Sequence, residues 1–186
     1  MSYTKNIMEK DTQYIYVHGL GSSKNSRKYR EIELKYPGSI CFDWVIGDNL
    51  HDKINEWIDV VKNCQLDVVL IASSTGCNLV CQMNVILSKT NNYQKTILLN
   101  PLLCLNQIIK KEILPAEVLK YIREIGFFNG CCIIVSDNDE VLDYKKISDS
   151  ILTNNQIVIS RNDNHNMLRF KEYFEIIDRY VASICI

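Results

Sequence analysis

The fold is decided by residues 67–76, Asp67-Val68-Val69-Leu70-Ile71-Ala72-Ser73-Ser74-Thr75-Gly76. The stretch begins with a short, nearly continuous apolar run, which is typical of a strand buried on both faces of a sheet. It ends in small polar residues, and a helix-like segment over 76–88 follows directly. A strand that turns sharply into a helix predicts one unit of an α/β fold with a parallel sheet.

The same alternation continues in both directions along the chain. Strands are expected over 14–17, 39–42, 67–72, 96–99, 131–135 and 156–159. Helices are expected over 26–35, 50–62, 76–88, 105–125, 141–152 and 168–184, with Pro115 splitting the fourth. The pattern predicts a single α/β domain over residues 1–186, with about six mostly parallel strands and helices on both faces of the sheet.

Composition excludes several classes of protein. The chain of 186 residues is 47% hydrophobic and 23% charged, which is typical of globular domains and not of disordered chains. A net charge of −1 argues against a broad nucleic-acid-binding surface. No apolar run reaches membrane-span length and the first six residues lack signal-peptide features, so we expect a cytoplasmic protein without a membrane span.

The eight cysteines are expected to be free thiols, mostly buried, because they lie in apolar strand-like and helix-like segments. Cys77 and Cys81 could share a helix face, but no Cys or His pair at zinc-finger spacing lies nearby. The sequence therefore predicts no metal site.

Polar clusters follow four of the expected strands. They span residues 18–23, 73–76, 136–139 and 162–165. Ligands of parallel α/β sheets bind beyond the carboxyl ends of the strands, so these clusters are expected to meet in one site.

Ser74 is the expected nucleophile, because a sharp strand-to-helix turn exposes a serine Oγ. Such a turn requires small residues two positions before and after the serine. Ala72 and Gly76 satisfy this requirement, whereas the equivalent neighbours of Ser73 are both β-branched. Taken alone, the pattern is equally typical of a helix that merely packs closely on a strand.

The Gly-rich loop after the first strand is expected to complete an oxyanion hole from the backbone amides of Leu20 and Thr75. It lacks the spacing of phosphate-binding loops. The remaining residues assigned to this loop and the pocket wall are His18, Gly19, Gly21 and Ser22, with His18 organising the loop rather than reacting.

His165 is the expected general base, because it lies in a polar loop after the last strand. His51 opens an amphipathic helix and is expected at the surface. Asp137 and Asp139 both follow the fifth strand at a suitable spacing for the triad carboxylate, whereas Asp163 is expected to shape the histidine loop.

Nucleophile, acid and base in this chain order resemble the α/β-hydrolases. Several segments resemble, more narrowly, the small bacterial esterases of the YqiA type; they are 16–23, 73–76, 99–101, 139–144, 164–165 and 170–174. The resemblance implies a triad of Ser74, Asp139 and His165, and it favours Asp139 over Asp137. It also implies that residues 101–130 form a cap, shorter than is usual in that family.

The expected function is a serine hydrolase for carboxylic esters or thioesters with a short or accessible acyl group. Its partner would be a small-molecule substrate, without metal or organic cofactor. Two alternatives remain open: a catalytically silent binding protein with a hydrolase-like fold, and an amidase or acyltransferase that uses the same triad.

Overall fold

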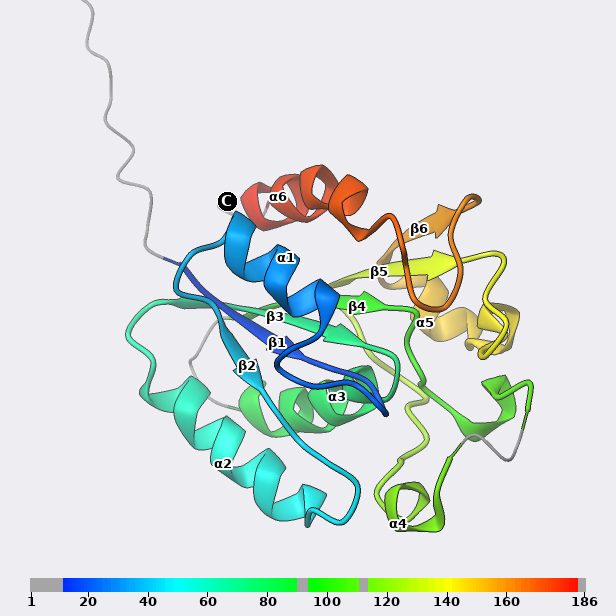
Figure 1. Ribbon diagram of the computed structural model, residues 1–186, viewed down its shortest axis with the longest axis horizontal. Helices are drawn as coiled ribbons and strands as arrows, with labels where there is room; N and C mark the ends of the chain where they lie inside the picture. Colours follow the sequence, from blue (N-terminus) through cyan, green and yellow to red (C-terminus); the bar gives the residue numbers. More distant parts are fainter. Residues whose placement is uncertain (1–11, 90–93, 111–113, 184–186) are drawn as a thin grey trace, which may run out of the picture.

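A six-stranded parallel sheet forms the centre of the computed structural model, which describes residues 12–89, 94–110 and 114–183 (Figure 1). The strands are β1 (Thr12–Val17), β2 (Ile40–Phe42), β3 (Asp67–Ser73), β4 (Gln94–Leu99), β5 (Cys131–Ser136) and β6 (Gln156–Ser160). Their order is β2-β1-β3-β4-β5-β6, and every neighbouring pair is parallel. The α/β architecture expected from the alternating pattern is therefore confirmed.

The central strands are buried on both faces of the sheet, since consecutive strand residues point in opposite directions and an apolar cluster covers each face. In β3, Val68 and Leu70 belong to one apolar cluster, and Val69 and Ile71 belong to another on the opposite face. All four are 4% exposed or less. This two-sided burial explains why the strands are continuous apolar runs and not alternating ones.

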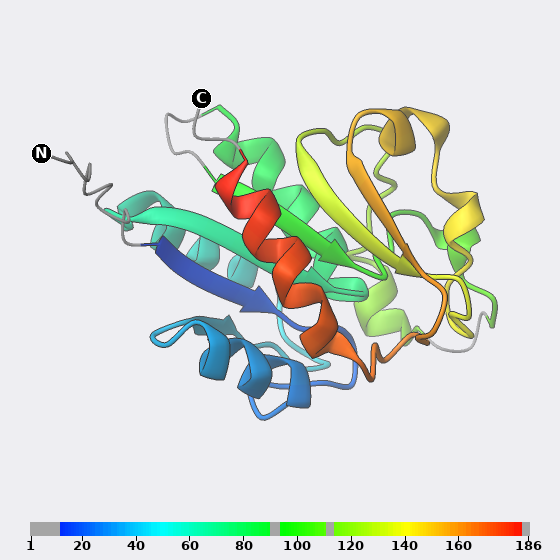
Figure 2. The same cartoon turned by 90° about the horizontal axis from the view of Figure 1, so that it is seen from above.

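Helices cover both faces (Figures 1 and 2). Helices α1 (Arg27–Lys35) and α6 (Phe174–Ala182), with the 3₁₀ turn η4 (Phe170–Tyr173), pack on one face. Helices α2 (Leu50–Asn63), α3 (Thr75–Leu87), α4 (Ala116–Leu119) and α5 (Asp149–Thr153) pack on the other. Helix α3 follows β3 almost directly and α1 follows β1 after a loop over 18–26, so the N-termini of both helices lie at the carboxyl edge of the sheet.

The expected helices over 105–125 and 141–152 are wrong in extent. Among the described residues, the first segment holds only the 3₁₀ turn η1 (Leu105–Gln107) and the four-residue α4, which begins after Pro115. The second holds η3 (Tyr144–Lys146) and α5. Gln107 explains part of the difference, because its side chain accepts hydrogen bonds from the amides of Leu103 and Cys104 and replaces helical bonding there.

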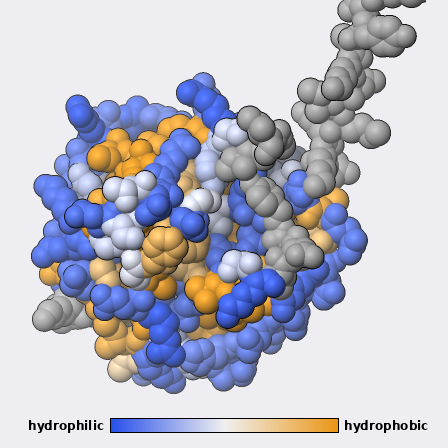
Figure 3. Space-filling view, turned by 180° about the vertical axis from the view of Figure 1, so that it is seen from behind, coloured by the Kyte–Doolittle hydropathy of each residue, from blue (hydrophilic) through white to orange (hydrophobic). Residues whose placement is uncertain are grey.

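The exposed apolar side chains form separate patches within a mostly hydrophilic surface on the face seen in Figure 3. No helix within the described ranges has the length and hydropathy that crossing a membrane requires. The seven described cysteines are free thiols, and five of them are buried. Cys185 lies outside the described residues.

Candidate active site

Ser74 lies in a strained turn between β3 and α3. Its backbone angles are φ 53° and ψ −120°, a conformation that non-glycine residues rarely adopt and that costs about 1–3 kcal/mol. Two neighbours permit the turn. Ala72 is fully buried, and a Cβ on Gly76 would lie only 2.5 Å from the His18 carbonyl oxygen. Glycine is therefore required at position 76, as the sequence predicts, although the close approach is to the end of β1 and not to Ala72.

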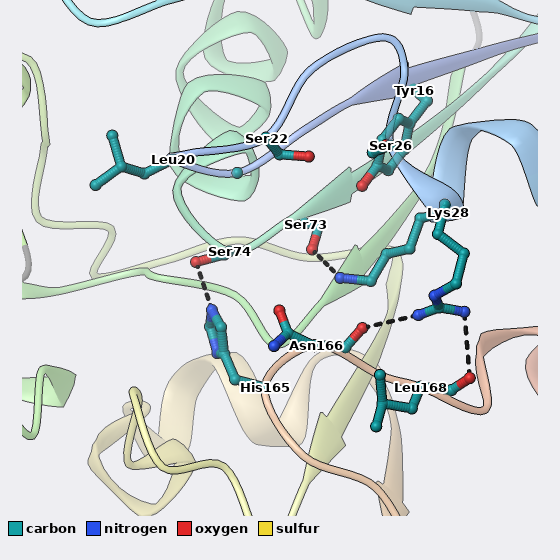
Figure 4. Close-up of a pocket in the computed structure, with 12 residues that line it drawn as sticks. Tyr16, Leu20, Ser22, Ser26, Lys28, Ser73, Ser74, His165, Asn166 and Leu168 are labelled. Atoms are coloured by element: carbon teal, nitrogen blue, oxygen red, sulfur yellow. Dashed lines mark hydrogen bonds between the residues drawn. The ribbon is translucent and has the colours of Figure 1, made fainter.

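Three side chains from separate loops form one hydrogen-bonded chain. Ser74 Oγ lies 3.0 Å from Nε2 of His165, which comes from the loop after β6 (Figure 4). Nδ1 of the same imidazole lies 2.8 Å from Oδ2 and 3.0 Å from Oδ1 of Asp139, which follows β5. This geometry lets the imidazole receive a proton from the serine while the carboxylate fixes its orientation.

Asp139 is held from behind by backbone amides. Its Oδ1 accepts hydrogen bonds of 2.8 Å from the amides of both Val141 and Leu142, and its side chain is only 3% exposed. Asp137, the other candidate acid, is exposed, and its backbone amide bonds to Ser160 O. The structure thus brings Asp139, and not Asp137, to the imidazole.

The histidine loop is positioned by Asn100, which follows β4. The buried Asn100 Nδ2 donates to the carbonyls of Asn164 and His165 and to Ser136 Oγ, each at 3.1 Å. Its Oδ1 accepts from the amide of Ser136 at 2.7 Å. Neither Asn100 nor Ser136 was predicted from the sequence to have a role in the site. The Asn-Pro pair directly after a strand was the available signal, because Asn tolerates the observed φ of 43°.

Asp163 shapes the other side of the same loop. Its carboxylate accepts from the amides of Asn164, Leu168 and Arg169 and from the Tyr173 hydroxyl. None of these bonds is to the His165 imidazole, so Asp163 shapes the loop, as the sequence predicts.

The loop after β1 lies directly over Ser74. A Cβ on Gly19 would lie 3.0 Å from both Ser73 O and the Ser74 Cβ, so glycine allows this close approach without displacing the serine turn. Leu20 and Ser22 also line the pocket beside Ser74. Gly21 takes a φ of 70°, a turn conformation that favours glycine, and is not part of the pocket lining.

His18 is buried and holds the loop instead of facing the pocket. Nε2 of the ring lies 2.8 Å from Asp43 Oδ1, Nδ1 lies 2.8 Å from Gly19 O, and the ring stacks on Trp44. Thr75, whose amide is an expected oxyanion donor, is buried at the first residue of α3. The first-turn amides of this helix favour negative charge at the serine.

The pocket beside Ser74 has a volume of about 250 Å³, and Arg27 and Lys28 of α1 lie in its wall. Figure 4 shows Lys28 beside Ser73. Burial, followed by the nearby Arg27 charge, lowers the pKa of Lys28 from 10.5 to about 8. Neither residue was predicted from the sequence as part of the site. No described residue of the expected cap, 101–130, lines this pocket. Within the described part of the chain, no three or more His, Cys, Asp or Glu side chains group as metal ligands.

Comparison with known proteins identifies the fold. No protein-family model matches the sequence, and neither does any curated protein. Among solved structures, Est1E from Butyrivibrio proteoclasticus matches at a TM-score of 0.66 and 17% identity, over 96% of this chain and 91% of that one. The ydeN gene product of B. subtilis matches at 0.63 and 12%, over 92% and 100%.

A third match is α/β hydrolase domain-containing protein 10 from mouse, with a TM-score of 0.62 and 14% identity over 92% of this chain and 87% of that one. These structures do not single out the YqiA-type esterases. The sheet order, the strained serine turn and these likenesses together show that the chain has the α/β-hydrolase fold.

Proposed function

We propose that this protein is a serine hydrolase that cleaves carboxylic esters or thioesters, with Ser74 as nucleophile, His165 as base and Asp139 as the orienting carboxylate. The observation that carries the proposal is the chain of contacts from Ser74 Oγ through the imidazole to Asp139, at 3.0 Å and 2.8 Å. Three loops must be placed together to produce it. Hydrogen bonds between side chains and backbone hold two of them, since Asn100 donates to the histidine loop and Asp139 accepts from two amides of its own loop.

In the first half of the reaction, Ser74 Oγ attacks the acyl carbon and His165 Nε2 takes its proton. The carbonyl oxygen becomes an oxyanion, which the amides of Leu20 and Thr75 would hold; one such donor contributes about 10²–10³-fold in rate. Asp139 stabilises the imidazolium that forms. The tetrahedral intermediate then collapses, the bond to the alcohol or thiol breaks, and the leaving group receives the proton from His165.

In the second half, a water molecule attacks the acyl carbon of the acyl-enzyme while His165 removes its proton. The second tetrahedral intermediate expels Ser74, which regains the proton, and the carboxylic acid leaves. The protein supplies all of the proton transfers in this scheme, so it needs no metal or organic cofactor.

The ester class is supported by the neighbours in fold. One structure of Est1E holds ferulic acid, and another similar structure is an arylesterase. Because these matches are 16% and 12% identical, they indicate the kind of bond to test first and not the substrate. A small-molecule ester suits the pocket volume of about 250 Å³.

Labelling with a fluorophosphonate probe tests the nucleophile. Wild-type protein should form a covalent adduct, and mass spectrometry of the labelled peptide should locate it on Ser74 and not on Ser73. Ser74→Ala should not label, whereas Ser88→Ala, at the exposed end of α3, should label like wild type. A folded wild type that does not label would favour a binding protein.

Substrate comparison tests the bond. Hydrolysis of p-nitrophenyl acetate and butyrate, of an acetyl thioester and of an acetanilide should rank the ester or thioester first. An anilide that is cleaved best would indicate an amidase, and transfer to an added alcohol in preference to water would indicate an acyltransferase.

A further inference from the structure

Lys28 presents an ammonium group to the pocket beside Ser74. Nζ lies 3.1 Å from Ser73 Oγ, its one hydrogen-bond partner among the described residues (Figure 4). In the same part of the chain, no carboxylate oxygen lies within 4 Å of this nitrogen. An ammonium group has three donors, so the pocket contains a cation with bonding capacity to spare.

Arg27, the preceding residue, differs in this respect. Its guanidinium contacts both carboxylate oxygens of Glu31 at 3.0 Å and donates to the carbonyls of Asn166, Met167 and Leu168. Its charge is therefore neutralised, and its donors are used to hold the histidine loop against α1. Of these two cations, only Lys28 is uncompensated by an adjacent carboxylate.

The rest of the pocket wall suits an anion. The described lining holds no Asp or Glu, several serine hydroxyls and the N-terminal end of α1, which has no acidic residue in its first turn. A helix N-terminus favours negative charge, and hydroxyls can donate to it. The titratable groups that act on Lys28 from the elements around it, together with those in the pocket wall, are Arg27, Cys77, Asp139, Asp163, Tyr16 and His165.

We infer that the substrate carries an anionic group, a carboxylate or a phosphate, which Lys28 binds while the ester bond lies at Ser74. This inference rests on the proposed function, because it names the substrate class of the same site. Ser73 and Ser74 are consecutive residues, so the cation and the nucleophile are within the reach of one small molecule.

Matched substrates test the inference. Monoethyl glutarate and ethyl pentanoate have acyl chains of equal length and differ in a terminal carboxylate. The corresponding phosphate pair is 1-acetylglycerol 3-phosphate and 1-acetylglycerol. Hydrolysis is followed by proton release. For at least one pair, wild type should favour the charged ester by about ten- to hundredfold in kcat/KM. The pair that shows the preference identifies the anion as carboxylate or phosphate.

Two variants test whether Lys28 causes the preference for the charged ester. Lys28→Met should reduce the ratio of charged to neutral kcat/KM to about one, and the ratio is taken within each variant so that a general loss of activity cancels. Lys35→Met is the matched control, because Lys35 lies at the other end of α1 and pairs with Asp178 at 2.9 Å. It should keep the wild-type ratio. A wild-type ratio near one for both pairs, or a ratio unchanged in Lys28→Met, would overturn the inference.

The pH dependence of this ratio distinguishes anion binding from a purely structural role of Lys28, because a structural lysine would leave the ratio the same at every pH. Burial places the pKa of Lys28 at about 8, so the ratio should fall between about pH 7 and 9 as the ammonium group loses its proton. Carboxylate and phosphate groups are already ionised there, and any effect of pH that is common to both esters cancels in the ratio. A ratio that stays constant over this range would contradict the assignment to Lys28.

Calorimetry separates this inference from the proposed function. Free glutarate and glycerol 3-phosphate are titrated into wild type and Lys28→Met. If no ester is hydrolysed but one anion binds wild type at least tenfold more tightly than the variant, the anion site stands and the hydrolase proposal fails. If esters are hydrolysed, the kinetic ratio decides. If no ester is hydrolysed and neither anion distinguishes the two proteins, both proposals fail.

Discussion

Replacing Gly76 by alanine should push β1 and the loop after it away from α3. A Cβ at this position would lie 2.5 Å from His18 O and 2.6 Å from Val17 O, far inside ordinary van der Waals contact. Both obstructing atoms belong to the backbone, so no side chain can rotate to make room. The strand end or the start of the helix must move.

The expected loss of stability follows from two opposing terms. Overpacking costs about 1–3 kcal/mol, and contact with two backbone oxygens places this site near the upper end. Alanine is favoured over glycine in a helix by about 1 kcal/mol, which offsets part of that cost. The net destabilisation is about 2 kcal/mol, and for a chain of this size it lowers Tm by about 4–8 °C.

Thermal and urea unfolding measure this change, with Gly126→Ala as the control. A Cβ at Gly126 meets no atom within 4 Å, so that variant should match wild type or gain less than about 1 kcal/mol. Gly76→Ala should also react more slowly with a fluorophosphonate, because the displaced loop carries an expected oxyanion donor. A Gly76→Ala protein that melts at or above the wild-type temperature would refute the close approach of helix and strand.

Three further predictions concern the triad, its support and the pocket lysine. Asp139→Asn should lower kcat by about ten thousandfold with little change in Tm, because the two backbone amides bind the carboxamide oxygen and turn the NH₂ group toward His165; near-normal turnover would contradict this orientation. Asn100→Ala should cost about 1–3 kcal/mol in urea unfolding and lower kcat about tenfold to a hundredfold, since the histidine loop loses its anchor; an unchanged kcat would remove Asn100 from the site. The unfolding free energy of wild type relative to Lys28→Met should rise between pH 8 and pH 10.5, because the folded protein releases the Lys28 proton at about pH 8 and the unfolded chain keeps it to about 10.5; a flat difference would place Lys28 in water.

The sheet could be predicted from the sequence because its central strands β3, β4 and β5 are buried on both faces and read as continuous apolar runs, although the edge strand β6 is partly exposed. The expected strands over 67–72 and 131–135 differ by one residue from β3 and β5. Helices after residue 100 were less predictable. Apolar residues at helical spacing occur there, yet Gln107 and Pro115 divide the chain into short turns, and the loops depend on long-range bonds such as Asn78 Nδ2 to Leu102 O. Periodicity carries no information about such bonds.

The meeting of the three proposed triad residues could be predicted, but not the residues that support them. Ser74, Asp139 and His165 are found by their positions after strands, since parallel strands end at one edge. Lys28 does not follow a strand but lies within helix α1. A signal did exist, because Lys28 precedes the fully buried Ile32 by one helical turn and therefore shares its inward face. Using that signal requires knowing where Ile32 packs.

The two basic residues at the start of α1 show how one helix can contribute both structure and specificity to the site. Arg27 is neutralised by Glu31 and binds the carbonyls that follow His165, so it fixes the base relative to α1. Lys28, one residue later, points elsewhere because consecutive residues of a helix lie about 100° apart. Because no adjacent carboxylate among the described residues neutralises it, the Lys28 charge is available to a ligand. Any movement of α1 that weakened anion binding should therefore also displace His165 from Ser74, and under the proposed function it should slow acyl transfer as well.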